Sequence, residues 1–181
     1  MADFLPQRGS YKDLKAYQIS ECIYDITYYF AHTFLNCGDR TVDQMIQAAR
    51  SGKQNIAEGS AAATTSRETE IKLTNVAKAS LQELKLDYED FLRTRELTLW
   101  QISDPRTEQT RRVCMTHNDS AYYREAVKHR SAETVANIAL VLLHQADYML
   151  RKLLEVQRQS FLEKGGIREE MAAARKKYRG Y

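Results

Sequence analysis

The sequence predicts an all-α protein that folds as an antiparallel up-down four-helix bundle. Only two prolines and seven glycines occur among 181 residues, so long windows contain no helix breaker. In four of these windows, apolar residues recur at the three- and four-residue steps that place side chains on one helix face. Mostly short connections favour antiparallel neighbours, with one long crossover before the last helix.

The first helix is expected over residues 11–36. Glycine readily adopts the left-handed conformation that closes many helices, so the Cys37-Gly38 pair is predicted to end this one. Its buried face should combine aliphatic and aromatic side chains, namely Ile19, Cys22, Ile23, Ile26, Tyr29, Phe30 and Phe34.

The second and third helices are expected over residues 41–59 and 66–100. Each opens on the spacing of a capping box, in which side chains three positions apart satisfy the first backbone N–H groups. The two pairs are Thr41 with Gln44 and Thr65 with Glu68. Heptad spacing marks the core positions of the third helix, which are Ala77, Leu81, Leu84, Tyr88 and Phe91.

Residues 101–130 are more polar and lose this periodicity, so we expect a loop or a partly helical crossover. The fourth helix is expected over residues 132–161 and completes a bundle domain of residues 1–163. Residues 164–181 follow a Gly165-Gly166 joint and should form a basic helical tail. The stripe of the fourth helix is the most apolar: Val135, Ile138, Leu142, Ala146, Met149, Leu153 and Val156.

Composition narrows the class of protein. A hydrophobic content of 43% suffices for a core, but no apolar segment approaches the ~20 residues that a membrane span needs. No signal peptide is visible at the N-terminus. Three scattered cysteines, Cys22, Cys37 and Cys114, suit a reducing compartment better than a disulfide framework. We therefore expect a cytoplasmic protein without a membrane contact.

The helix expected over residues 41–59 carries two parallel seams at heptad spacing instead of one. The first seam consists of Met45, Ala49, Gly52, Ile56 and Gly59. The second seam consists of Gln44, Ala48, Ser51, Asn55 and Glu58. A surface helix needs only one apolar stripe, so small and hydrogen-bonding residues beside it predict a second close contact. That contact would join copies of the chain into a closed homo-oligomer.

Three blocks of sequence carry a family resemblance. They are residues 11–17, residues 44–59 with their ending Asn-Ile-Ala-Glu-Gly, and residues 77–84 with Ser80 and Glu83. Together they resemble the bacterial four-helix bundle family that includes the intervening-sequence proteins of 23S ribosomal RNA and the accessory variability determinants of diversity-generating retroelements. The chain departs from that pattern at Gln47, where arginine is usual, and at Gly52-Lys53, which replace an apolar residue and proline.

The resemblance implies a four-helix bundle that assembles as a homopentameric barrel, here with a C-terminal suffix. It also implies a protein without catalytic activity. Implied partners are RNA or DNA, or a reverse transcriptase.

Enzyme signatures are mostly absent from the sequence. A di-iron bundle needs two Glu-x-x-His pairs, whereas Glu125 and His129 form a single pair at the wrong spacing. No phosphate-binding glycine loop, nucleophile elbow or paired-cysteine motif occurs. We therefore expect no catalytic residue, no metal site and no cofactor.

Polar and small residues of the second and third helices have two interpretations. They can satisfy one another where helices or protomers pack, because a buried polar group without a partner is costly. Alternatively, they line a recognition surface. The predicted structural and interface residues are Gln44, Ser51, Gly52, Asn55, Glu58, Gly59, Ser80 and Glu83.

Basic residues suggest where a polyanion would bind. The chain carries a net charge of +3, and bulk positive charge is concentrated in residues 164–181. Surface cations usually form only a solvated helix face, but a cyclic oligomer repeats each of them and strengthens the local field. The predicted nucleic-acid-binding residues are Arg50, Lys53, Arg67, Lys72, Lys78, Arg175, Lys176 and Lys177.

These observations predict a non-enzymatic, oligomeric adaptor that associates with nucleic acid through basic surfaces, with a reverse transcriptase-type partner, or with both. The alternative is a protein–protein interaction module with no direct nucleic-acid role.

Overall fold

A computed structural model describes residues 10–180, and this part of the chain is helical with no β-strand. It contains a short 3-10 helix, η1, and seven α-helices. Their bounds are η1 Tyr11–Asp13, α1 Lys15–Phe34, α2 Arg40–Ala62, α3 Arg67–Thr94, α4 Pro105–Thr116, α5 Ser120–Val127, α6 Ala132–Lys164 and α7 Ile167–Arg179. The all-α prediction is confirmed.

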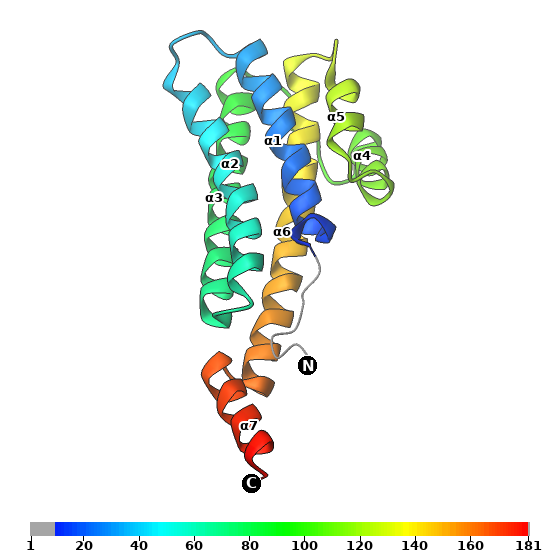
Figure 1. The fold of residues 1–181 in the computed structure, drawn as a ribbon. Coiled ribbons are helices and arrows are strands. Elements are labelled where there is room, and N and C mark those ends of the chain that lie inside the picture. Colours follow the sequence, from blue (N-terminus) through cyan, green and yellow to red (C-terminus); the bar gives the residue numbers. More distant parts are fainter. Residues whose placement is uncertain (1–9, 181) are drawn as a thin grey trace.

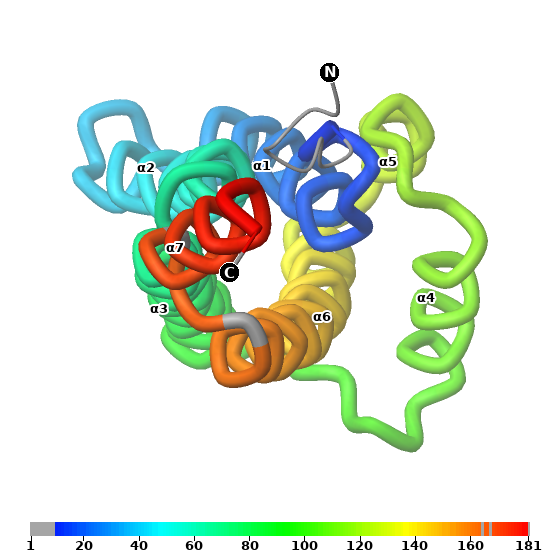
Figure 2. Tube along the Cα trace, turned by 60° about the horizontal axis from the view of Figure 1, so that its bottom comes forward, coloured from blue at the N-terminus to red at the C-terminus, as the bar shows by residue number. Residues whose placement is uncertain are grey.

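Four long helices, α1, α2, α3 and α6, lie side by side and run in alternating directions (Figure 1). Helix α2 packs against α1 and α3, and α6 packs against α1 and α3, which closes the bundle (Figure 2). The crossover from α3 to α6 contains α4 and α5, which cover the outer sides of α6 and α1 respectively. Helix α7 continues beyond the far end of α6 (Figure 1).

Aromatic packing stabilises the part of the core that lies between the C-terminal halves of α1 and α3. The Phe30 ring of α1 lies 4.9 Å from Tyr88 and 4.8 Å from Phe91 of α3, between ring centroids. The buried Tyr88 hydroxyl donates to Thr27 Oγ1 at 3.0 Å, so this polar atom enters the core with a partner. The predicted apolar faces of the first and third helices therefore meet each other.

The first seam of α2 is buried within the chain. Met45, Ala49 and Ile56 are all at most 2% exposed, and Gly52 and Gly59 are buried with them. A Cβ atom at Gly52 would lie only 2.4 Å from Leu81 Cδ2 of α3. A side chain at position 52 would therefore displace Leu81, so the close approach of the two helices favours glycine there.

Several predicted helix ends are wrong by a few residues. Helix α1 ends at Phe34, and Gly38 adopts its positive φ of 90° in the turn that follows. Helix α2 is capped by Asp39, whose Oδ1 accepts from the Thr41 N–H at 2.9 Å. Asp39 occupies the N-cap position, two residues before Thr41, so the predicted Thr41–Gln44 capping box does not form.

Helix α3 also starts and stops differently from the prediction. Ser66, not Thr65, is its N-cap, and Ser66 Oγ accepts from the Thr69 N–H at 3.1 Å. The helix ends at Thr94, so Trp100 lies in the following segment.

In α6, Val156 of the predicted stripe is 67% exposed, while Leu150, Leu154 and Gln157 are buried. An α-helix has 3.6 residues per turn, so a strict heptad drifts off the core side over such a long helix.

Candidate nucleic-acid interface

The predicted cations of α2 and α3 do not form one surface. Arg50 is exposed on α2, and Lys53 Nζ lies 4.4 Å from the centre of the Tyr24 ring of α1. On the other side, Lys78 Nζ is 3.9 Å from Asp147 of α6. Exposed Lys72 pairs with Glu68 of its own helix at 2.7 Å. Among the predicted cations of α2 and α3, Lys53 is the one that the structure places in contact with a side chain of α1.

Arg67 is not a surface cation. Its side chain is 7% exposed, and Nη1 donates to the carbonyl oxygen of Ser160 at 2.9 Å and to Ser160 Oγ at 3.1 Å. The other guanidinium nitrogen pairs with Glu170 of α7. Arg67 therefore joins α3, α6 and α7, and its donors are not free to bind phosphate. This role cannot be recognised from the sequence, because the partners are 93 and 103 positions away.

The tail cations remain accessible. Arg175, Lys176 and Lys177 are exposed in the second half of α7, while Glu169 and Glu170 lie in its first turn. This charge order also stabilises the helix through its dipole. The arm is thus attached through its acidic start and presents its basic end to solvent.

An aromatic stripe runs along the outer side of α1 at four-residue steps. It consists of Tyr24, Tyr28 and His32, which we call the α1 aromatic face. The Tyr28 and His32 rings are stacked, with centroids 4.3 Å apart and an interplanar angle of 29°. The Tyr24 and Tyr28 rings follow at 6.4 Å. Tyr28 is 50% exposed, so a flat ligand could reach its ring.

Cations from two other helices flank this face. Lys53 of α2 covers the Tyr24 ring, and Arg124 and Lys128 of α5 line an open groove of about 490 Å³ along the α1 aromatic face. Arg124 lies 3.6 Å from Asp25, and Lys128 lies 2.5 Å from Glu125. The Lys128–Glu125 pair is exposed and contributes little free energy, whereas Asp25 is only 20% exposed and itself lines the groove.

The α1 aromatic face was not among the predicted site residues. Its sequence signal is the spacing Tyr24-x3-Tyr28-x3-His32, a second stripe beside the apolar core stripe of the same helix. Arg124 of α5 and Lys128, its C-cap, cannot be assigned to this face from the sequence, because residues 101–130 predict only a loop or a partly helical crossover.

The second seam of α2 faces a groove between α2 and α3. Ser51 Oγ and Ser80 Oγ share a hydrogen bond of 2.9 Å, and Asn55 Nδ2 donates to the Ser51 carbonyl at 2.8 Å. Glu58 is exposed farther along. The groove, of about 630 Å³, is lined by Asp43, Gln44, Gln47, Ala48, Ser51, Ser80, Glu83 and Asp87.

This α2–α3 groove is acidic. Partial burial, with Asp90 and Glu83 nearby, raises the pKa of Asp87 above its ordinary value. Such a lining repels phosphate and suits a protein surface that supplies cations or amide donors. None of the predicted cations is among the residues that line this groove.

Other chemistry has little support in the described part of the chain. No group of three or more His, Cys, Asp or Glu side chains there could hold a metal ion, and none of the described helices is long and apolar enough to cross a membrane. Burial raises the pKa of the Cys22 thiol to about 12 and raises that of Cys114, which keeps both thiols protonated. Comparisons with protein-family models, curated proteins and solved structures found no match for this chain.

Proposed function

We propose that this protein is a non-enzymatic adaptor that binds single-stranded nucleic acid on the α1 aromatic face. The observation that carries the proposal is the exposed Tyr28–His32 stack, with Arg124 and Lys128 in the same groove and Lys53 over the neighbouring Tyr24 ring. The resemblance of the sequence to a bundle family associated with nucleic acid supports the same function.

The arrangement suits stacking better than base-specific recognition. The Tyr28 and His32 rings already stack on each other at 4.3 Å, so unstacked bases would pack against the parts of these rings that face solvent. Each base stacked on an aromatic side chain contributes ~1–3 kcal/mol with little dependence on its identity. The flanking cations add phosphate contacts, which make binding sensitive to salt. The expected ligand is therefore a flexible single strand bound without sequence preference.

Self-association is part of the proposal. Val76 and Leu86 of α3 are 46% and 59% exposed and lie on the side of α3 that carries Glu83, next to the α2–α3 groove. A ring of copies joined there, five by the family resemblance, would repeat the α1 aromatic face and bind one strand with avidity.

Light scattering tests this part. The protein should be a closed oligomer, and the double change Val76→Glu and Leu86→Glu should yield monomers with unchanged helicity. Ile102→Glu, at a position that is 83% exposed in the crossover, is the matched control and should leave assembly intact. A wild-type monomer at micromolar concentration contradicts the proposed association.

The binding test is fluorescence anisotropy with labelled oligouridylate, mixed-sequence RNA, single-stranded DNA and duplex RNA across a salt series. Tyr28→Ala should weaken single-strand binding about 5- to 150-fold without changing the salt slope. Changing Lys53, Arg124 and Lys128 together to Gln should reduce the salt slope.

The matched controls lie on α6. Tyr148 is 51% exposed, with the Arg151 guanidinium 5.9 Å from its ring, so Tyr148→Ala and Arg151→Gln remove the same chemistry elsewhere. Equal losses from Tyr148→Ala and Tyr28→Ala would exclude a specific α1 site. Loss only on neutralising Arg175, Lys176 and Lys177 would assign binding to the arm.

The acidic α2–α3 groove favours one alternative, a protein–protein interaction module. A basic partner surface, such as that of a reverse transcriptase-type protein, could occupy the groove in place of a second copy. If no oligonucleotide binds at low salt up to high micromolar protein, the nucleic-acid proposal fails and a protein partner is the function to test.

A further inference from the structure

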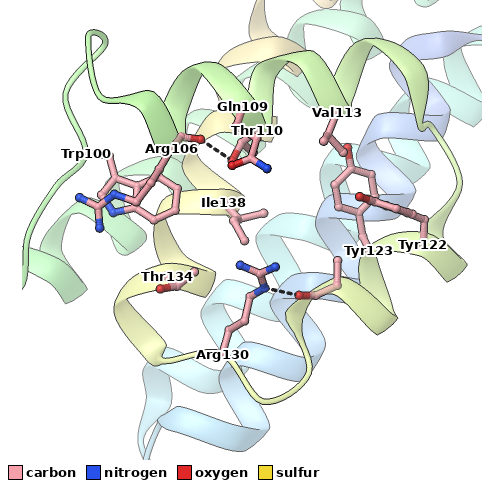
Figure 3. Close-up of a pocket in the computed structure, with 11 residues that line it drawn as sticks. Trp100, Arg106, Gln109, Thr110, Val113, Tyr122, Tyr123, Arg130, Thr134 and Ile138 are labelled. Carbon is pink, nitrogen blue, oxygen red and sulfur yellow. Dashed lines mark hydrogen bonds between the residues drawn. The ribbon is translucent and has the colours of Figure 1, made fainter.

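A separate pocket lies between α4, α5 and the first turns of α6 (Figure 3). It measures about 250 Å³. Trp100 and Tyr122 stand on opposite sides of it, and Ile138 of α6 lies between them at its base (Figure 3). Thr110 and Gln109 border it on the α4 side. The pocket thus combines aromatic walls with an apolar base.

Trp100 is held in place by a buried hydrogen-bond network. Its backbone N–H donates to Asn137 Oδ1 at 2.8 Å, and Asn137 Nδ2 donates to the Thr98 carbonyl at 2.8 Å. Asn137 itself is 1% exposed. The indole Nε1–H of Trp100 is buried and has no acceptor in the described structure.

Two arginines border the pocket, and they differ in whether a carboxylate pairs with them. Arg106 stacks on the Trp100 ring at 4.7 Å and makes two hydrogen bonds to Asp104, at 3.1 and 2.8 Å, which neutralise it. Arg130 donates from Nε to the Ala126 carbonyl, and its terminal nitrogens extend toward the space below Ile138 (Figure 3). No carboxylate among residues 10–180 forms an ion pair with Arg130.

The turn before Arg130 is strained. His129 has a φ of 61°, in the left-handed region that non-glycine residues seldom adopt. This conformation lies between α5 and α6 and precedes the residue that presents its charge to the pocket. Strain of this kind often persists where a side chain must be held in a particular place.

We propose that this pocket binds a small monocyclic aromatic carboxylate. The carboxylate would pair with Arg130, and the ring would lie over Ile138 between Trp100 and Tyr122. A volume of about 250 Å³ is smaller than the 300–1,000 Å³ typical of pockets for drug-sized ligands, which excludes a whole nucleotide. The site shares no residue with the α1 aromatic face, so its test is independent of the proposed function.

The chain provides its own reporter, because Trp100 is its single tryptophan. Titration with benzoate, nicotinate and phenylacetate, followed by tryptophan fluorescence, should give a saturable change for at least one of them. The uncharged isostere of that ligand, for example benzamide for benzoate, should bind up to about fivefold more weakly, because Arg130 is exposed and an exposed ion pair is weak. Fluorine NMR of 4-fluorobenzoate gives a second readout that does not depend on Trp100.

Arg130→Gln should lower the affinity for the acid to that of its neutral isostere. Arg130 is exposed, so this variant should fold, which circular dichroism checks. Arg112→Gln is the matched control on α4, since Arg112 is exposed, pairs with Glu108 and lies outside the pocket. Ala126→Phe, which fills the pocket, should abolish binding. Equal binding of acid and isostere, equal effects of the two arginine changes, or no saturable response to any of the three acids would overturn the proposal.

Discussion

The contact between Gly52 and Leu81 allows a test of the α2–α3 packing. Gly52→Ala should destabilise the protein when Leu81 is present and stabilise it when Leu81 is shortened to alanine. Gly52→Ala adds a Cβ atom that would lie 2.4 Å from Leu81 Cδ2 and 2.7 Å from Leu81 Cγ. Alanine favours a helix over glycine by about 1 kcal/mol. Overpacking a core costs ~1–3 kcal/mol, and Leu81 is only 4% exposed, so it cannot easily move away. The substitution should therefore destabilise the protein by up to about 2 kcal/mol.

The reverse is expected after Leu81 is shortened. Leu81→Ala alone should cost ~2–5 kcal/mol through lost burial and a cavity. It also removes every side-chain atom that the new Cβ would meet within 4 Å. In this background Gly52→Ala should stabilise by about 1 kcal/mol, from helix propensity, and partly fill the cavity. The coupling energy should thus be ~1–3 kcal/mol.

Urea unfolding of the four proteins of this cycle measures the coupling. All four should be compared at one protein concentration, because self-association shifts apparent stability. Gly38→Ala serves as the control, since Gly38 has a φ of 90° and no heavy atom within 4 Å of the added Cβ. Its cost, ~1–2 kcal/mol of backbone strain, should be the same in both backgrounds. If Gly52→Ala changes the free energy of unfolding equally in the wild-type and Leu81→Ala backgrounds, the inference that α2 and α3 approach closely at Gly52 is wrong.

Two further predictions concern the arm and the response to pH. Truncation after Lys164 should leave a folded bundle with a melting temperature only about 2–4 °C lower, because Arg67 loses its partner Glu170 but keeps its hydrogen bonds to Ser160. Loss of cooperative unfolding in the truncated protein would show instead that α7 belongs to the core. Partial burial, together with Lys85 and Arg111, lowers the pKa of His144 below its ordinary 6.5. The folded state therefore binds fewer protons than the unfolded state, and stability present above about pH 6.5 should be lost as the pH falls through the folded-state pKa. Urea midpoints between about pH 7 and pH 5 should fall less steeply for His144→Asn, and parallel slopes would contradict this sign.

The four long helices could be predicted because their signal is local. Residues three and four positions apart share a helix face whatever the rest of the chain does, so the stripes of α1 and α3 identified the core side. Helix ends were less predictable, since Asp39 and Thr41, or Thr65 and Ser66, are all good N-caps. The choice between them depends on where the connecting backbone turns.

The candidate sites depend on contacts between segments that the sequence does not relate. Lys53 and Tyr24 come from different helices, and α5 reaches the α1 aromatic face only because the crossover folds back over α1. Each cation looked equivalent in the sequence. Packing then buried Arg67 and left Lys53 beside an aromatic ring.

By itself, then, the sequence determined the helical class, the core faces and the two seams of α2, because each depends on a repeat along one helix. Tertiary structure decided which seam the chain buries, how Arg67 joins three helices, and that Trp100 and Arg130 border one pocket. The physical reason is that burial and charge pairing depend on distance in space. Residues 93 positions apart, such as Arg67 and Ser160, become neighbours only when the whole bundle has closed.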